Sequence, residues 1–134
     1  MSHVMNIGEA AKQSGISSKM IRYYEDIGLL EVAQRSASGY RLYAAQDIRD
    51  LIFLRHARDL GFSTLQMKEL MGLWKKTDRN SAEVKQMTLK HIENLNQKIK
   101  ELQTMVLFLQ ESANQCAGNE QTECAILNQI ERGA

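Results

Sequence analysis

Residues 7–30 read IGEAAKQSGISSKMIRYYEDIGLL and carry the clearest structural signal in the chain. The first part has apolar residues at helical spacing and stops at Gly15, which predicts one short helix. The helical pattern restarts with Ser17 or Ser18 as the N-cap and ends at Gly28. Two short helices joined by a tight turn form the helix-turn-helix pattern.

The segments that follow predict a small hairpin and then two more helices. Residues 35–43 read RSASGYRLY, in which serine and glycine supply turn chemistry and the tyrosines and leucine favour strands. We therefore expect a β-hairpin, or wing, after the second helix. Helical spacing returns over residues 44–62 and 63–76, and Gly61 separates these two helices.

A long last helix is predicted to begin near Asn80, where NSAE forms a capping box. Beyond it, apolar residues recur at alternating spacings of three and four, the a/d pattern of a coiled coil. They are Ile92, Leu95, Ile99, Leu102, Val106 and Leu109. A helix over residues 81–114 would be roughly 50 Å long, too long for the preceding domain to cover. The alternative is a stripe packed on its own domain, but the pattern favours a homodimer.

The composition is that of an ordinary folded domain with an appended element. Of 134 residues, 25% are charged and 43% hydrophobic, and the net charge is only +1. Residues 1–76 contain 11 Lys/Arg against 8 Asp/Glu, a mild asymmetry that indicates a basic surface on the N-terminal half. No apolar run reaches the roughly 20 residues that span a bilayer, so we expect a cytoplasmic protein with no membrane partner. Met5 is a candidate natural start, which would make residues 1–4 an extension.

Two basic clusters in the predicted helix-turn-helix and wing suit double-stranded DNA. Each places two cations and a tyrosine together, as phosphate contacts and insertion into a groove require. They are Lys19, Arg22 and Tyr23 on the second helix, and Arg35, Tyr40 and Arg41 on the hairpin. Either cluster alone fits an ordinary solvated basic face, but the two in this order favour DNA binding.

The strings IRYYE, GLL and GYRLY resemble the DNA-binding domain of the MerR family of transcriptional regulators, in an almost gap-free match from about Met5 to Lys76. The resemblance implies a mainly α-helical fold. Residues 1–76 would form a winged helix-turn-helix domain, residues 80–114 a dimerisation helix in an antiparallel coiled coil, and residues 115–134 a metal-binding loop with a short helix.

The resemblance also implies a function. Family members are homodimers that bind promoter DNA with a long spacer, distort it when activated and so allow RNA polymerase to engage. The six basic and tyrosine residues named above match the family's DNA-contacting positions, and Arg58 matches one near a second wing. Because no catalytic arrangement or phosphate loop is recognisable in the sequence, we do not expect an enzyme.

The only two cysteines, Cys116 and Cys124, lie in the segment NQCAGNEQTECAI. Thiols stay reduced in the cytoplasm, which disfavours a disulfide, although two incidental small hydrophobic residues remain an alternative. Thiolates suit soft ions such as Cu(I), and Cys124 lies at the predicted start of a helix, where the dipole favours a thiolate. Glu120 and Glu123 offer oxygen ligands to a divalent ion in an alternative site.

This loop, followed by AILNQIER, resembles the metal-binding end of the copper efflux regulators (CueR-like), in which two thiolates bind Cu(I), Ag(I) or Au(I). Ser81 matches the serine of the copper-type sensors, where zinc- and mercury-sensing relatives have a third cysteine. A cap is the simpler interpretation of Ser81. Lys85, one turn further on, is expected to offset the net negative charge of two thiolates and one monovalent ion.

We therefore expect a Cu(I)-responsive activator of copper efflux and tolerance genes. One alternative is a Zn(II), Cd(II) or Pb(II) sensor that adds carboxylates to the two cysteines. Another is a DNA-binding adaptor without an effector. Two cysteines are too few for the four-cysteine iron–sulfur clusters of redox-sensing relatives.

Overall fold

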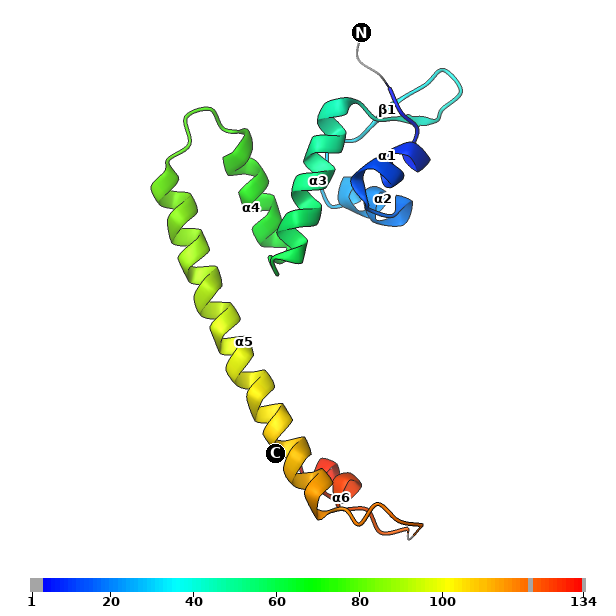
Figure 1. Ribbon diagram of the computed structural model, residues 1–134. Helices are drawn as coiled ribbons and strands as arrows, with labels where there is room; N and C mark the ends of the chain where they lie inside the picture. The colour runs from blue at the N-terminus through cyan, green and yellow to red at the C-terminus, as the bar shows by residue number, and fades with distance from the viewer. Residues whose placement is uncertain (1–3, 121, 134) are drawn as a thin grey trace. The chain divides into compact units, whose positions relative to one another are not determined.

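The computed structural model describes residues 4–120 and 122–133, so the expected extension lies outside the described residues apart from Val4. This part of the chain contains six α-helices and one two-stranded sheet, which confirms the mainly α fold class (Figure 1). The chain divides into two compact units, Met1–Gln86 and Met87–Ala134. No helix of the described residues is long and apolar enough to cross a membrane.

The first two helices form the predicted helix-turn-helix pair. α1 (Ile7–Ser14) begins at a capping box with Asn6 as the N-cap. α2 (Ser18–Asp26) is capped by Ser17, whose hydroxyl accepts a backbone N–H of the first turn. Gly15, between them, has a φ of 76°, a left-handed conformation that glycine adopts without a Cβ clash.

The predicted hairpin is present but is shorter than the stretch RSASGYRLY. β1 (Gln34–Arg35) pairs antiparallel with β2 (Arg41–Leu42), so each strand contributes two residues. Beyond β2, Tyr43 leaves this ladder and forms an isolated antiparallel bridge with Met5. The N-terminal segment is thus tied to the hairpin, a pairing that the sequence analysis did not foresee.

Two further helices complete the first unit, at the positions expected from the sequence. α3 (Ala45–Asp59) packs on α1, α4 (Thr64–Lys75) packs on α3, and Ser63 caps α4 in a capping box. Their apolar faces enclose one hydrophobic core. Its largest fully buried side chains are Tyr24, Tyr43, Ile16, Ile21, Leu51, Leu54 and Met67.

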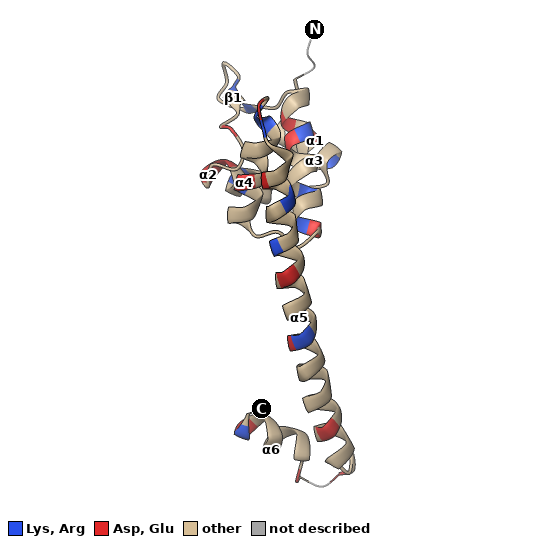
Figure 2. Ribbon diagram, turned by 90° about the vertical axis from the view of Figure 1, so that its left-hand side faces the viewer, with Lys and Arg blue, Asp and Glu red and all other residues tan. Residues whose placement is uncertain are grey.

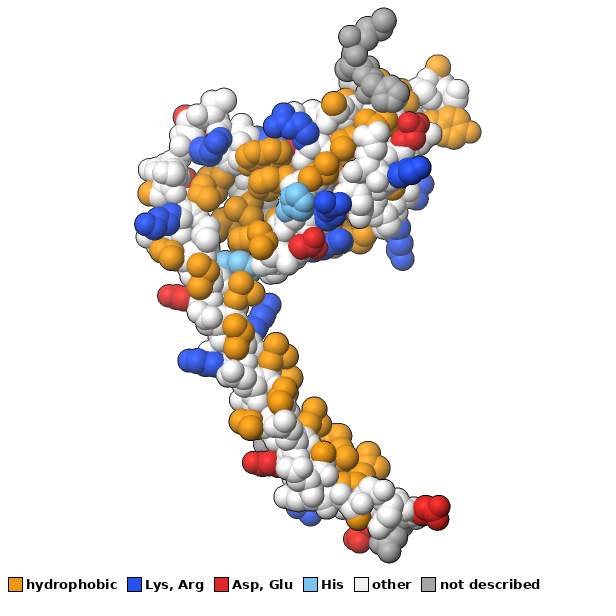
Figure 3. All heavy atoms as spheres, in the orientation of Figure 1, with side chains coloured by type: hydrophobic (Ala, Val, Ile, Leu, Met, Phe, Trp, Pro, Cys, Tyr) orange, Lys and Arg blue, Asp and Glu red, His pale blue; other side chains and the backbone are white. Residues whose placement is uncertain are grey.

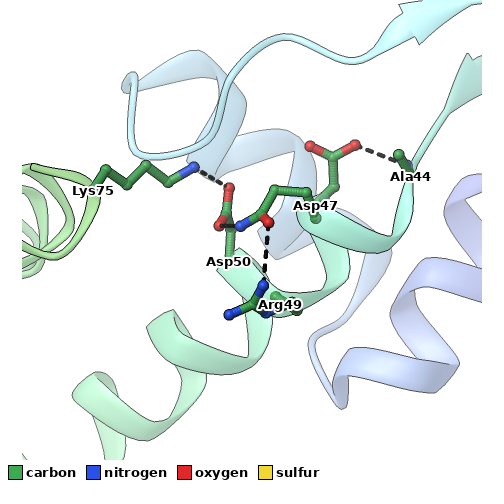
Figure 4. Close-up of polar contacts among 6 residues, drawn as sticks. Ala44, Asp47, Arg49, Asp50 and Lys75 are labelled. Carbon is green, nitrogen blue, oxygen red and sulfur yellow. Dashed lines mark hydrogen bonds and ion pairs between the residues drawn. The ribbon is translucent and has the colours of Figure 1, made fainter. Parts of the chain in front are cut away.

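An ion pair between a buried aspartate and a partly exposed lysine joins α3 to the end of α4 (Figure 4). Asp50 is 4% exposed and accepts hydrogen bonds from Lys75 Nζ at 2.6 Å and from Gln46 Nε2 at 2.9 Å. Beside this pair, the rings of Phe53 and Trp74 stack with centroids 4.3 Å apart. A buried carboxylate needs such partners, because an unpaired charge in the core is strongly destabilising.

The second unit consists of most of the long helix and a short one. α5 (Ser81–Gln115) has 35 residues, and α6 (Ala125–Arg132) has eight. Acidic and basic residues are interspersed along α5 (Figure 2), whereas hydrophobic side chains gather along one of its faces (Figure 3). Of the six predicted stripe residues, Leu95 is half-buried and the other five are exposed. The stripe therefore offers an apolar surface to another molecule.

Candidate metal centre and DNA-binding surface

The two thiols lie together where α5 gives way to α6. Cys116 follows Gln115, the last residue of α5, and Cys124 is the N-cap of α6. Their Sγ atoms are 3.8 Å apart, and both residues are half-buried free thiols. A disulfide bond would be about 2.05 Å long. Because a thiolate–metal bond is about 2.3 Å long at zinc, two sulfurs at this separation fit one shared ion.

The loop that carries the thiols is closed by a side-chain contact between the two helices. Gln129 Nε2 on α6 donates to Gln115 Oε1 on α5 at 3.2 Å. Gly118, inside the loop, has a φ of 64°, which favours glycine at this turn. The loop therefore brings both sulfurs together within one short stretch of chain.

The start of α6 favours the thiolate form of Cys124. The backbone N–H of Leu127, assisted by the Cys116 side chain and the N–H of Ile126, holds the pKa of Cys124 below its usual range. Desolvation acts in the opposite direction and is outweighed. These backbone groups belong to the first turn of a helix, where N–H groups have no partner within the helix. A soft metal ion binds the deprotonated sulfur that this arrangement favours.

The other expected metal-site residues belong to the first unit, whereas the thiols belong to the second. Ser81 and Lys85 lie in the first turns of α5 and are exposed, whereas Cys116 follows the last turn of that helix. The roles expected of Ser81 and Lys85 stay predictions. Across residues 4–120 and 122–133, no three His, Cys, Asp or Glu side chains are grouped to hold a metal ion. The loop glutamates thus do not complete a site with the cysteines.

The face of α2 that was expected to meet DNA is exposed to solvent. Lys19, Arg22 and Tyr23 lie on this face, and Tyr23 is 44% exposed. Ile21 and Tyr24 point the other way and are fully buried in the core. The 3.6-residue period of the helix thus separates a basic surface from an apolar face that is buried in the core.

The hairpin residues expected to contact DNA also take part in local contacts. Arg35 Nη1 donates to the carbonyl oxygen of Gly39 at 2.8 Å and so braces the turn. Tyr40 follows this turn and is 72% exposed. Arg58, in the last turn of α3, is exposed as well. These side chains are accessible to a partner from outside the chain.

Arg41 is tied to α2 through a buried carboxylate that the sequence analysis missed. Its Nε lies 3.2 Å from Oε2 of Glu25, close enough for an ion pair although the N–H is not aimed for a hydrogen bond. Glu25 is 6% exposed and also accepts a hydrogen bond from the Tyr43 hydroxyl. Burial, and then this carboxylate, raise the pKa of Tyr43. The hairpin is thereby fixed to α2.

Comparison with models of known protein families shows the family to which the chain belongs. The model for the MerR family regulatory protein matches residues 6–43, and the MerR DNA-binding model matches residues 48–111. The chain belongs to the MerR family. Members of this family are DNA-binding transcription regulators, which confirms the expected function class and the expectation that the chain is not an enzyme.

Relatives of this MerR-family chain extend over almost its whole length. It is 49% identical over 130 residues to Heavy metal-dependent transcription regulator 2 of Rhizobium meliloti, covering 97% of this chain and 88% of the relative. It is 40% identical over 126 residues to the HTH-type transcriptional regulator CueR of Escherichia coli, covering 94% and 93% respectively.

Solved structures of MerR-type regulators have the same fold. A transcription regulator from Ralstonia metallidurans in complex with lead(II) matches with a TM-score of 0.78 and 29% identity, over 94% of this chain and 98% of that one. MerR from Bacillus megaterium in complex with mercury(II) matches with a TM-score of 0.67 and 26% identity, over 95% and 99%.

Proposed function

We propose that this MerR-family protein is a heavy-metal-responsive transcription regulator whose effector is a monovalent ion, Cu(I), with Ag(I) and Au(I) as chemical equivalents. The observation that carries the proposal is the pair of free thiols 3.8 Å apart at the junction of α5 and α6. The names of the relatives support the coarser class, since one is a heavy metal-dependent regulator and another is CueR.

The size of the ligand set favours a monovalent ion. The two sulfurs are not grouped with a third His, Cys, Asp or Glu side chain within the described residues. Zinc takes four protein ligands at structural sites and three protein ligands plus a water at catalytic ones, whereas soft thiolates suit Cu(I). A bound ion would link Cys116 to Cys124 and so couple the end of α5 to the start of α6.

We further propose that two copies pair through the exposed stripe of α5 as an antiparallel coiled coil. The heptad spacing and the exposure of five of its six residues support this pairing. An antiparallel arrangement would bring Ser81 and Lys85 of one copy toward the thiols of the other. Lys85 would then offset the negative charge that two thiolates and a monovalent ion leave unbalanced.

In this proposal, residues 1–76 are the DNA-binding domain, residues 80–114 the dimerisation helix and residues 115–134 the metal-binding segment. The dimer binds promoter DNA through α2, the hairpin and Arg58. Distortion of the promoter, with a cost of about 1–6 kcal/mol for a bend, lets RNA polymerase engage. Metal favours the activating shape only by binding it more tightly than the repressing shape.

A divalent sensor is the second candidate. The loop contains Glu120 and Glu123 beside the cysteines, and the Ralstonia metallidurans structure is a lead(II) complex. Both carboxylates would have to move to join the thiols, because the described residues form no such group. Titration with both classes of ion separates the two candidates.

The test is a competition titration of reduced protein with Cu(I), Ag(I), Zn(II) and Pb(II), followed by transcription from a promoter with an elongated spacer. We expect Cu(I) and Ag(I) to bind and activate. Cys116→Ser and Cys124→Ser should each weaken Cu(I) binding by more than the roughly 10–100-fold of outer-shell changes. Thr122→Ser, in the same loop, is the matched control and should respond normally. Activation by Pb(II) or Zn(II) but not Cu(I) would support the second candidate.

A further inference from the structure

The turn between α1 and α2 is held by an arginine that lies 41 residues away in the sequence. Arg55, on α3, donates from Nη1 to the carbonyl oxygen of Ser14 at 2.9 Å. This carbonyl belongs to the last turn of α1, where C=O groups have no partner within the helix. Ser14 itself is fully buried, and its Oγ accepts the N–H of Ile16 at 3.2 Å. The turn is therefore fixed on two sides.

Gly15 shows how closely the guanidinium approaches the turn. A Cβ at this position would lie 2.3 Å from Arg55 Nη1 and 3.3 Å from its Cδ. The arginine thus fills the space that a side chain at position 15 would occupy. Glycine is required here for a second, independent reason, because its φ is +76°.

The exposed basic face of α2 begins directly after this turn, with Lys19 and Arg22. α1 contacts both α2 and α3, so a fixed α1–α2 turn also fixes the direction in which α2 leaves it. We propose that Arg55 is a positioning residue for DNA recognition, which sets the angle of α2 without itself contacting DNA. The proposal rests on the assignment of α2 to DNA binding and deepens it.

The salt dependence of DNA affinity distinguishes positioning from a phosphate contact. The probe is a duplex selected from random-sequence DNA by the unsubstituted full-length protein. We expect Arg55→Met to weaken binding roughly tenfold, the value of a lost charged hydrogen bond, with the slope of log affinity against log salt unchanged. Circular dichroism at the assay temperature should show a fully folded variant.

Arg55→Lys should remain weak, because one ammonium group does not reproduce the planar guanidinium contact with the turn. A slope reduced by about 0.9 in Arg55→Met, or full affinity in Arg55→Lys, would overturn the proposal in favour of a phosphate contact. Unchanged affinity with a lower Tm would reduce Arg55 to a stabilising residue. Arg58→Met is the matched control on the same helix and should lower the slope.

A thermal double-mutant cycle tests the contact without DNA. Gly15→Ala should lower the Tm more when Arg55 is present than when Arg55 is replaced by alanine. The backbone strain from the positive φ is the same in both backgrounds, whereas the clash between the new Cβ and the arginine is absent from the Arg55→Ala background. Equal losses in both backgrounds would contradict the close approach. If the unsubstituted protein selects no duplex, the assignment to DNA binding fails, whereas the cycle still reports on the turn.

Discussion

Cys124 shows how one backbone environment sets the chemistry of a side chain. The N–H of Leu127 is the main cause of its lowered pKa, so the thiolate should persist to lower pH than an ordinary thiol with a pKa of about 8.5. The lowered pKa of Cys124 stabilises the folded chain at pH values above the pKa of this thiol in the unfolded chain. The stabilisation is lost as the pH falls through the pKa of the thiol in the folded chain.

We expect iodoacetamide to alkylate Cys124 in the Cys116→Ser variant with a pH midpoint below that of the same variant in denaturant. Mass spectrometry of quenched samples gives the rates. The denatured variant is the internal control, because its thiol lacks the helix N-terminus. Coincident midpoints would show that the start of α6 does not stabilise the thiolate.

The pKa of Tyr43 is shifted in the opposite direction to that of Cys124, so the folded chain favours the protonated hydroxyl. Burial and Glu25 raise its pKa, so its hydroxyl donates at neutral pH. The stabilisation is complete below the unfolded pKa of about 10 and is lost as pH rises through the folded value. Tyr43→Phe should lower the free energy of unfolding by about 1–3 kcal/mol, because a buried carboxylate loses a donor. Urea denaturation at pH 7 measures the loss, and Tyr23→Phe, on the exposed face, should change it little.

At the scale of elements, the Asp50–Lys75 ion pair links α4 to α3, and we expect it to contribute to the free energy of unfolding. Lys75→Met removes the hydrogen bond from Lys75 Nζ to Asp50 and keeps the one from Gln46 Nε2. The Lys75 side chain is 42% exposed, so solvent screening reduces the effect below that of a fully buried pair. We expect Lys75→Met to lower the free energy of unfolding by about 1–2 kcal/mol, as measured by urea denaturation. Lys76→Met, one residue later and exposed, should stay within about 0.5 kcal/mol of the unsubstituted protein.

The stripe on α5 gives a prediction about association. Leu102 is 58% exposed in the single chain, and the proposed coiled coil would bury it. Leu102→Glu should therefore shift the protein from dimer to monomer at micromolar concentration, since a charge at an a/d position has no partner there. Sedimentation velocity measures the change, with Glu101→Gln as the neighbouring control. A dimer that survives Leu102→Glu would place the interface elsewhere.

For the whole molecule, local signals were readable from sequence and distant contacts were not. Gly15 marked a helix boundary correctly, and so did Ser17 as one of the two serines expected to cap the second helix, because turn and cap chemistry involves only neighbouring residues. Neither the Met5–Tyr43 bridge nor the bond from Arg55 to Ser14 could be read this way. Each joins segments far apart in sequence through a backbone group, which every residue possesses: the first pairs backbone atoms on both sides, and the second reaches a backbone oxygen from a side chain.

At the candidate site, too, the sequence predicted some features, and others are visible only in the fold. Two cysteines in one loop predicted a pair of soft ligands, but only the fold shows that their sulfurs lie 3.8 Å apart. Glu25 was missed because an acidic residue next to Tyr24 resembles any other solvated position on a short helix. Its burial follows from the tertiary contacts of Arg41 and Tyr43, for which a helical period gives no indication.

The compact loop between Cys116 and Cys124 has a consequence for how such a regulator can diversify. Both thiols, their hydrogen-bonded glutamine brace and the helix start beside Cys124 are encoded within residues 115–129. Closing so short a loop requires little chain entropy. In the proposed metal site, a few substitutions confined to this segment would change which ion binds and would leave the proposed DNA-binding residues unchanged. The ion that the protein binds and the promoter that it recognises could then evolve independently of each other.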